Sequence, residues 1–297
     1  MNFEYLSNLS KKEKSWDKHK ANAEKIADYY RGSEFDKYAQ RIDLCAQLLN
    51  FEIVLGKQQS QLKLSKARFC KVRTCPICQW RKSLRWKAKT YSILPLIVKE
   101  YPTYRWLFLT LTVKNCQINE LRDTLFWLNK SWQRLSQRKK FPAIGWIRTT
   151  EVTLGKRKTA HPHFHCLLLV KPSYFGKNYI KQNEWVNMWR SCTQIDYTPL
   201  VDIRPVKREH QPMMLIPEIL KYSIKESDLI KDKEWFLELT KQMSNMRTVA
   251  TGGVIKKYFK QLEQIPKNTA NTENTNNYES SLIYNWRDTN RRYKLVN

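Results

Sequence analysis

The chain has 297 residues, enough for one large domain or two modest ones. Hydrophobic residues make up 41% of it, and only 7 glycines and 11 prolines occur, which excludes a disordered or low-complexity protein. Lys and Arg total 54 against 27 Asp and Glu, and the net charge of +27 indicates a polyanionic partner, with nucleic acid ahead of a membrane surface.

The first half of the chain mixes predicted helices and strands. Residues 1–44 are polar and charged and should be helical, and short strands over 51–56 and 61–69 should be joined by a polar turn. A basic helix over 82–100 leads to residues 105–113, which are too apolar for an edge strand and should be central in a sheet. The next helix has an apolar stripe at steps of three and four: Ile118, Leu121, Leu125, Leu128, Trp132 and Leu135.

The second half contains a hairpin followed by helices. Residues 144–154 and 163–170 are predicted strands joined by a basic turn. After them we expect a short helix near 183–190, a strand over 201–206, helices over 217–230 and 233–244, and a glycine turn with a basic helix over 250–260. Hairpins rather than strict βαβ units favour an α+β fold, in which helices pack on an antiparallel sheet.

These elements divide the chain into four predicted parts. They are a polar helical segment (1–44), a zinc- and DNA-binding module (45–90), a larger α+β domain (91–264) and a polar C-terminal tail (265–297). The sequence has no apolar run long enough for a membrane-spanning helix and begins with no signal-peptide core. Clustered cysteines point to metal in a reducing compartment rather than to disulfides, so we expect a cytoplasmic protein.

Three cysteines predict a zinc site. Cys70, Cys75 and Cys78 lie close together, and the CPIC sequence has the spacing of two ligands in a tetrahedral zinc site. Cys45 is favoured as the fourth ligand because it precedes the predicted strands that lead back to Cys70. Alternatively, Cys45 is a buried apolar residue and a histidine such as His19 completes the site. Four protein ligands leave no open position, so this zinc should be structural.

Basic and aromatic residues provide a surface for nucleic acid. The 11 tryptophans and 15 tyrosines offer faces on which exposed bases can stack. Several cations around the cysteines are expected to contact duplex DNA: Arg73, Arg81, Lys82 and Arg85. A solvated protein face would carry similar cations, so their spacing alone does not decide between the two interpretations.

The segment HPHFHCLLLV predicts a second metal site. His163 and His165 alternate on a strand and therefore point to the same side, where neutral imidazoles can bind a divalent metal. A metal that acts on nucleic acid also takes oxygen ligands. If residue 154 pairs with 162, Glu151 lies opposite His165 on the same face, where an ionised carboxylate would otherwise be costly to bury. His161 has the same parity and is either a neighbour of the ligands or an alternative ligand.

A third constellation lies on the predicted helix that begins at Pro217. At about 100° per residue, Glu218, Tyr222 and Lys225 fall within an arc of roughly 60°. Apolar residues occupy the opposite side: Ile216, Leu220 and Ile224. The alternative interpretation is an exposed ion pair beside a surface tyrosine.

Taken together, these segments resemble the HUH endonucleases, and within them the replication initiators of rolling-circle plasmids, the Rep type 1 family. The resemblance rests on FCKVRTCPICQWRKSL, FLTLTV, HPHFHCLLLV, EILKYSIK and ATGGVIKKYFK, and covers roughly residues 45–260. It implies a five-stranded antiparallel sheet with the histidine strand in the centre. It also makes 91–264 the nuclease domain.

The resemblance implies a role for each matching residue. His163 and His165 match the metal-binding histidines, and Glu151 stands where the family places an acidic ligand. Tyr222 matches the nucleophile. The remaining matches are the flanking Glu218 and Lys225 and the zinc-module cysteines Cys45, Cys70, Cys75 and Cys78.

The chemistry implied is a metal-dependent nick of one strand at a plasmid origin, with Mg²⁺ or Mn²⁺ at the catalytic site. The phenol of Tyr222 would form a 5′ phosphotyrosine and leave a 3′ hydroxyl that a host polymerase, aided by a helicase, could extend. Glu218 lies one helical turn before Tyr222 on the same face of the predicted helix, and we expect it to act as a general base in termination, so that a water rather than a second tyrosine releases the product. The competing interpretation is that its carboxylate only stabilises the N-terminus of the helix electrostatically. The rivals are a related transposase or relaxase and, from another class, a non-catalytic zinc-knuckle DNA-binding protein.

Overall fold

The computed structural model describes residues 4–55, 60–206, 212–220, 224–264 and 281–296. They belong to two compact units. Unit 1 comprises Met1–Lys82, Leu229–Leu237 and Pro266–Asn297, and unit 2 comprises Ser83–Asp228 and Glu238–Ile265. The predicted boundary after residue 44 therefore falls inside unit 1, and the boundary after residue 90 falls inside helix α3 (Pro76–Glu100).

Unit 1 is built on a four-stranded antiparallel sheet in the order β2-β1-β8-β9. The strands are β1 (Leu48–Leu55), β2 (Ser60–Ala67), β8 (Ser281–Arg287) and β9 (Arg292–Leu295). The helices α1 (Lys11–Tyr30) and α2 (Asp36–Asp43) confirm the helical character expected of residues 1–44. The hydroxyl of Ser10 caps α1 by accepting hydrogen bonds from the backbone N–H groups of Lys12 and Glu13.

The C-terminal strands correct the prediction of a polar tail over 265–297. Strand β8 pairs with β1, and the backbone N–H of Leu295 donates to the carbonyl of Glu4 at 2.9 Å. The aromatic side chains of Tyr284, Trp286 and Tyr293 are buried. Burial of these rings against the N-terminal segments makes residues 281–296 part of the fold of unit 1.

Unit 2 contains the five-stranded antiparallel sheet that the family resemblance implied, in the order β6-β3-β5-β4-β7. Its strands are β3 (Arg105–Thr112), β4 (Ala143–Leu154), β5 (Ala160–Val170), β6 (Val201–Pro205) and β7 (Val249–Gly252). The histidine strand β5 is the middle one, and the apolar β3 has a neighbour on both sides, as expected. The α+β fold class is therefore confirmed.

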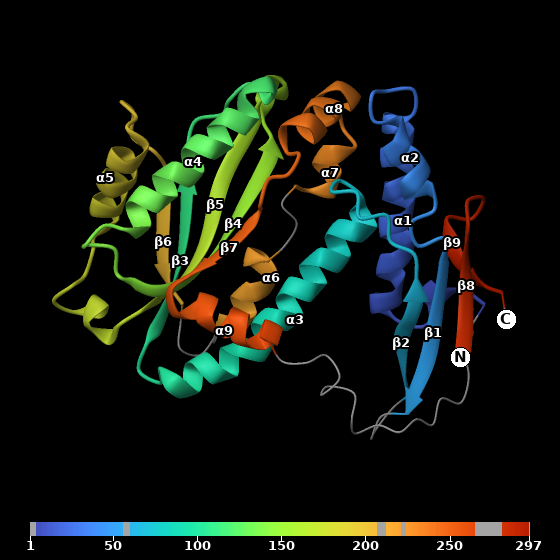
Figure 1. Cartoon of the computed structure of the whole chain (residues 1–297), viewed down its shortest axis with the longest axis horizontal. Helices are drawn as coiled ribbons and strands as arrows, with labels where there is room; N and C mark the ends of the chain where they lie inside the picture. The colour runs from blue at the N-terminus through green and yellow to red at the C-terminus, as the bar shows by residue number, and fades with distance from the viewer. Residues whose placement is uncertain (1–3, 56–59, 207–211, 221–223, 265–280, 297) are drawn as a thin grey trace. The chain divides into compact units, whose positions relative to one another are not determined.

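Helices cover both faces of this sheet (Figure 1). On one face lie α4 (Leu121–Ser136) and α5 (Gln182–Thr193), whose apolar residues pack against the rings of Phe164 and Trp146. The other face is covered by α3, α6 (Ile216–Ile219) and α9 (Gly253–Gln264), which share a core with Leu167 and Leu169 of β5. His163 and His165 lie on this second face by parity.

The predicted helix over 217–230 is wrong as a single element. Helix α6 ends at Ile219, and Leu220 has the non-helical angles φ −100° and ψ 26°. Residues 224 and 225 are also outside a helix, and short α7 (Glu226–Leu229) and α8 (Lys233–Gln242) follow. The predicted apolar side is nevertheless buried, at Ile216, Leu220 and Ile224. None of the helices in the described part of the chain is long and apolar enough to cross a membrane.

Candidate metal centres and catalytic site

The first candidate site lies on the β4–β5 hairpin. Leu154 pairs with Ala160, so Glu151 lies opposite His163 and Thr149 lies opposite His165. The register therefore differs by two residues from the predicted pairing of Glu151 with His165. Because the shift is an even number of residues, the carboxylate still shares a face with both imidazoles.

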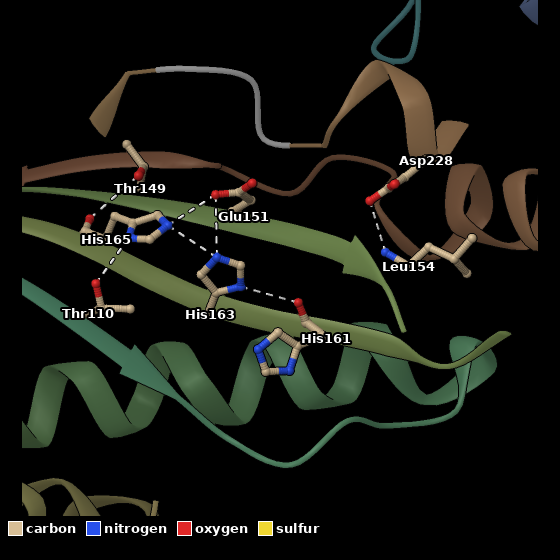
Figure 2. Close-up of polar contacts among 8 residues, drawn as sticks. All are labelled: Thr110, Thr149, Glu151, Leu154, His161, His163, His165 and Asp228. Atoms are coloured by element: carbon tan, nitrogen blue, oxygen red, sulfur yellow. Dashed lines mark hydrogen bonds and ion pairs between the residues drawn. The ribbon is translucent and has the colours of Figure 1, made fainter. Parts of the chain in front are cut away.

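The three side chains converge on one point (Figure 2). His163 Nε2 and His165 Nε2 are 3.1 Å apart, and Glu151 Oε2 lies 3.3 Å from the first and 3.0 Å from the second. A triangular face of an octahedral site with metal–ligand bonds of about 2.1 Å has edges of about 3.0 Å. Two nitrogens and one oxygen at these distances could hold a divalent metal ion, and the same residues form one of the two groups capable of it among the described residues.

The other ring nitrogens orient the imidazoles. His163 Nδ1 lies 3.3 Å from the carbonyl oxygen of His161, which can only accept, and this contact favours the tautomer whose Nε2 has a lone pair for a metal. His165 Nδ1 lies 3.2 Å from the hydroxyl of Thr110 on β3, the residue opposite it in the register. Such partners fix ring orientation in metal sites. Thr110 was not among the residues predicted from the sequence, although a threonine within the apolar run 105–113 was a usable signal.

The three side chains of this site are almost fully buried. The Glu151 side chain is 4% exposed, and those of His163 and His165 are 11% and 12% exposed. The ring of Phe108 stacks on that of His165, with centroids 5.7 Å apart. A carboxylate buried this deeply is costly unless a cation or hydrogen bonds compensate it, so the donor set fits a bound divalent cation.

His161 does not join this group. Its Nδ1 lies 2.7 Å from the side-chain oxygen of Asn115, and in Figure 2 its ring is turned away from the point where the other three side chains meet. Burial, followed by the neighbouring His163, lowers the pKa of His161. Its contribution to the site in this structure is the backbone carbonyl that holds His163.

Tyr222 lies outside the described residues, together with its two neighbours 221 and 223. Glu218 and Lys225, on either side of that gap, are exposed. The flanking backbone is fixed in unit 2: Leu220 is buried and its carbonyl accepts a hydrogen bond from the Ser83 hydroxyl. Further on, the buried Asp228 of α7 accepts a hydrogen bond at 3.2 Å from the backbone N–H of Leu154, at the end of β4 (Figure 2).

The second candidate site lies in unit 1 and consists of the four cysteines predicted from the sequence. Cys45 follows α2, whereas Cys70 and Cys75 lie between β2 and α3 and Cys78 belongs to the first turn of α3. The Sγ–Sγ distances are 3.5 Å for Cys70–Cys78, 3.7 Å for Cys45–Cys78 and 3.8 Å for Cys75–Cys45. A tetrahedron with zinc–sulfur bonds of about 2.3 Å has edges of about 3.8 Å. The four sulfurs therefore have the size of a tetrahedral thiolate site.

Backbone contacts support this sulfur cluster. The N–H groups of Cys70, Lys71 and Val72 point to cluster sulfurs at 3.3–3.4 Å. Hydrogen bonds from the neighbouring thiols lower the pKa of Cys78, whereas burial raises that of Cys75.

Two residues that were not predicted from the sequence hold the loop of Cys45. The buried Lys20 donates to the carbonyls of Asp43 and Cys45, and the hydroxyl of Tyr293, on β9, donates to the carbonyl of Ala46 at 2.6 Å. No local sequence pattern could have indicated them, because both lie far from Cys45 in the chain.

The alternative ligand His19 does not belong to the cluster. Its ring lies against that of Trp80, with centroids 4.7 Å apart. Of the predicted DNA-contacting cations, Arg81 lies over the rings of Trp16 and Phe69, Arg73 is half-buried, and Lys82 and Arg85 are exposed.

Comparison with known proteins identifies the family of this chain. A family described as "Replication protein" matches residues 61–294. The chain is 36% identical over 261 residues to "Protein rep" of Streptococcus pneumoniae serotype 2 (strain D39 / NCTC 7466), covering 85% of this chain and 81% of that protein. It is 34% identical over 283 residues to "Protein rep" of Bacillus amyloliquefaciens, covering 84% and 83%.

A third relative is "Protein rep" of Lentilactobacillus hilgardii, which is 33% identical over 269 residues and covers 86% of this chain and 84% of its own. No solved structure matches the chain. The family match begins within β2 and ends within β9, so it includes the whole five-stranded sheet of unit 2 and both candidate metal sites except Cys45, and it leaves out β1. The chain therefore belongs to the replication protein family of Rep type 1.

Proposed function

We propose that this protein initiates rolling-circle replication of a plasmid by nicking one strand of the origin and remaining attached to the 5′ phosphate through Tyr222. The observation that carries the proposal is the convergence of Glu151, His163 and His165 on one point at 3.0–3.3 Å. A non-catalytic DNA-binding function would not explain why two histidines and a glutamate converge in the middle of a sheet. Membership of a replication protein family supports an initiator rather than a transposase or a relaxase.

The three side chains would hold Mg²⁺ or Mn²⁺. When bound, this ion polarises the scissile phosphate and offsets the negative charge that develops on it. Three protein ligands leave further coordination positions for phosphate oxygens. Thr110 and the carbonyl of His161 hold both rings with their Nε2 atoms directed at the point where the side chains converge, so the site would be preorganised before DNA arrives.

The oxygen of Tyr222 would bond to phosphorus while the bond from phosphorus to the 3′ oxygen breaks, and that oxygen takes up a proton. The phenol has an ordinary pKa near 10 and must react as a phenolate. Lys225, three residues on and exposed, is available to stabilise the phenolate or the phosphate. The energy of the phosphodiester is kept in the tyrosyl linkage, so the step needs no nucleotide cofactor.

The test is covalent capture. Incubation with Mn²⁺ and a labelled single-stranded origin oligonucleotide should give an adduct, and Tyr222→Phe should abolish the adduct while leaving DNA binding intact. Tyr258→Phe is the matched control, because burial and a hydrogen bond to Glu100 raise the pKa of Tyr258 and disfavour its phenolate. An adduct that persists in Tyr222→Phe and maps to Tyr258 would refute the assignment.

Glu218 is proposed as the general base that activates a water in termination. Its expected position one helical turn from Tyr222 no longer supports this role, because the helix ends at Ile219. The match of Glu218 to the family's glutamate and the exposure of its carboxylate support the role. The Glu218→Ala variant should nick at a near-normal rate and accumulate replication products longer than unit length. Normal termination by this variant would contradict the general-base role.

The four cysteines would hold a structural zinc ion, and the cations that follow this cluster in the sequence would bind origin duplex. Arg73 and Arg81 are partly buried, so Lys82 and Arg85 are the cations best placed to contact phosphates. Replacing both by Gln should weaken duplex binding and reduce its salt dependence. A host helicase and polymerase would then act on the exposed 3′ hydroxyl.

A further inference from the structure

The turn that closes the β4–β5 hairpin contributes no side chain to the candidate metal site. It comprises residues 155–159, in which the backbone N–H of Gly155 donates to the carbonyl of Thr159 at 2.8 Å. Its tip consists of three consecutive exposed cations, Lys156, Arg157 and Lys158. The same hairpin carries Glu151 on one strand and His163 on the other. The cations are therefore built into the element that forms the candidate metal site.

The backbone of this turn is unfavourable for the residues it contains. Arg157 has φ 55° and ψ 36°, and Lys158 has φ 57°, so both are in the left-handed region. Hairpin turns with two such residues are usually filled by Asn and Gly, which tolerate positive φ. Two long cations are kept here against that preference. Residues other than glycine that are held at positive φ cluster at functional sites, where the rest of the fold offsets the cost of the strained backbone.

The turn is also held in one place. The Asn115 side-chain nitrogen donates to the Thr159 hydroxyl at 2.9 Å, and its oxygen lies 2.7 Å from His161 Nδ1. A Cβ on Gly155 would lie 2.3 Å from the Asn115 amide, so glycine is needed for this close approach. Asn115 thus fixes the basic turn relative to the strand that carries His163.

The dimensions suit an extended polyanion that crosses the metal site. At about 3.3 Å per residue, the five steps from Glu151 to Lys156 span at most roughly 17 Å. Lys and Arg side chains are long and flexible, so their charged groups can reach back over much of this distance. A DNA strand whose phosphate sits at Glu151, His163 and His165 would therefore place phosphates a few nucleotides away beside the turn.

We propose that the Lys156–Lys158 turn binds the sugar–phosphate backbone of the single DNA strand that leads away from the nicked phosphate. The inference rests on the proposed nicking function and adds a binding site to it. Contacts to phosphates carry no sequence information, so the turn should bind any sequence.

The first experiment measures binding without nicking. Affinity for a fluorescent single-stranded oligonucleotide is determined in EDTA for the wild type and for a variant with Lys156→Gln, Arg157→Gln and Lys158→Gln. The control variant removes the same charge from exposed lysines at the opposite end of the hairpin and its flanks: Lys139→Gln, Lys171→Gln and Lys177→Gln.

We expect the turn variant to bind single strands at least 10-fold more weakly than the control variant. The slope of log affinity against log salt should fall by about 2, at about 0.7 per phosphate contact. Equal affinities of the two variants would overturn the proposal. A larger loss for duplex than for single strand would also overturn it, because the turn would then belong to a duplex-binding surface.

The second experiment separates binding from folding. Arg157→Asn combined with Lys158→Gly supplies the residues that this backbone prefers and removes two charges. The melting temperature should rise while single-strand affinity falls, and these opposite signs cannot come from misfolding. Unchanged affinity in this variant would overturn the proposal. If none of the proteins nicks DNA, the nicking function fails, but the binding difference in EDTA still tests the turn.

Discussion

The two candidate metal sites are built in different ways. In unit 1 the cysteines come from a loop after α2, a loop after β2 and the first turn of α3. In unit 2 the ligands stand on two paired strands, and Glu151 lies directly opposite His163. The first site gathers segments that are distant in the sequence, whereas the second uses the register of a single hairpin.

This difference has a physical consequence. Four thiolates complete a tetrahedral shell, so a metal there can tie loops together but has no position for a substrate. Two imidazoles and one carboxylate leave positions open, and their orientation is already set by the sheet, Thr110 and a backbone carbonyl. We therefore expect the first metal to govern the stability of unit 1 and the second to govern chemistry, and four experiments test this division.

The largest effect should follow from Cys75→Ser, which removes a fully buried ligand. Structural zinc contributes folding free energy on the order of 10 kcal/mol, so unit 1 should lose its cooperative melting transition and its zinc. Metal analysis and thermal melting measure both. Cys116→Ser, outside the cluster in unit 2, is the control. A Cys75→Ser protein that retains zinc and melts normally would disprove the structural role.

The second effect is on activity alone. EDTA at moderate concentration should abolish nicking while the zinc content and the melting temperature stay unchanged, because three ligands release a metal more readily than four thiolates. Added Mn²⁺ should restore nicking. Full activity in EDTA would contradict a metal-dependent mechanism, and loss of zinc at the same EDTA concentration would contradict the division between the sites.

A smaller effect is expected from Thr110→Val, which preserves shape but removes the hydrogen-bonding partner of His165 Nδ1. Loss of such a partner typically weakens metal affinity by about 10–100-fold. The Mn²⁺ concentration needed for half-maximal nicking measures this change. Thr112→Val is the control on the same strand, because the Thr112 hydroxyl donates to the carbonyl of Leu200 instead. An equal change in both variants would show a general effect on the strand.

The smallest effect should come from Tyr293→Phe, which leaves the buried carbonyl of Ala46 without its hydrogen-bond donor. The expected loss is about 1–3 kcal/mol in the free energy of unfolding of unit 1, with faster zinc loss to a chelator. Tyr174→Phe removes a hydroxyl that contacts Ile180 and Trp185 in unit 2 and should not affect zinc loss. Identical zinc release in wild type and Tyr293→Phe would show that the C-terminal strand does not support the site.

The sequence determined those features that depend on local periodicity. Alternation along a strand places His163 and His165 on one face whatever the partner strand does, and Glu151 joins them for any register shift by an even number of residues. The spacing of Cys75 and Cys78 and the apolar stripe of α4 are local in the same sense, and the structure bears them out.

The remaining features were decided by contacts between distant residues. The actual register follows from a five-residue turn with two left-handed cations, which the hydrophobic pattern could not predict. The helix expected over 217–230 is not continuous, because α6 ends at Ile219. Next to this end Leu220 and Ile224 are buried, and the Ser83 hydroxyl donates a hydrogen bond to the Leu220 carbonyl. Strands β8 and β9 exist because their aromatic rings are buried in unit 1, more than two hundred residues from the strand they extend. Periodicity indicates which side of an element is apolar, but only the tertiary structure shows what that side packs against. This packing determines the registers of strands, the ends of helices and whether a polar segment forms a strand.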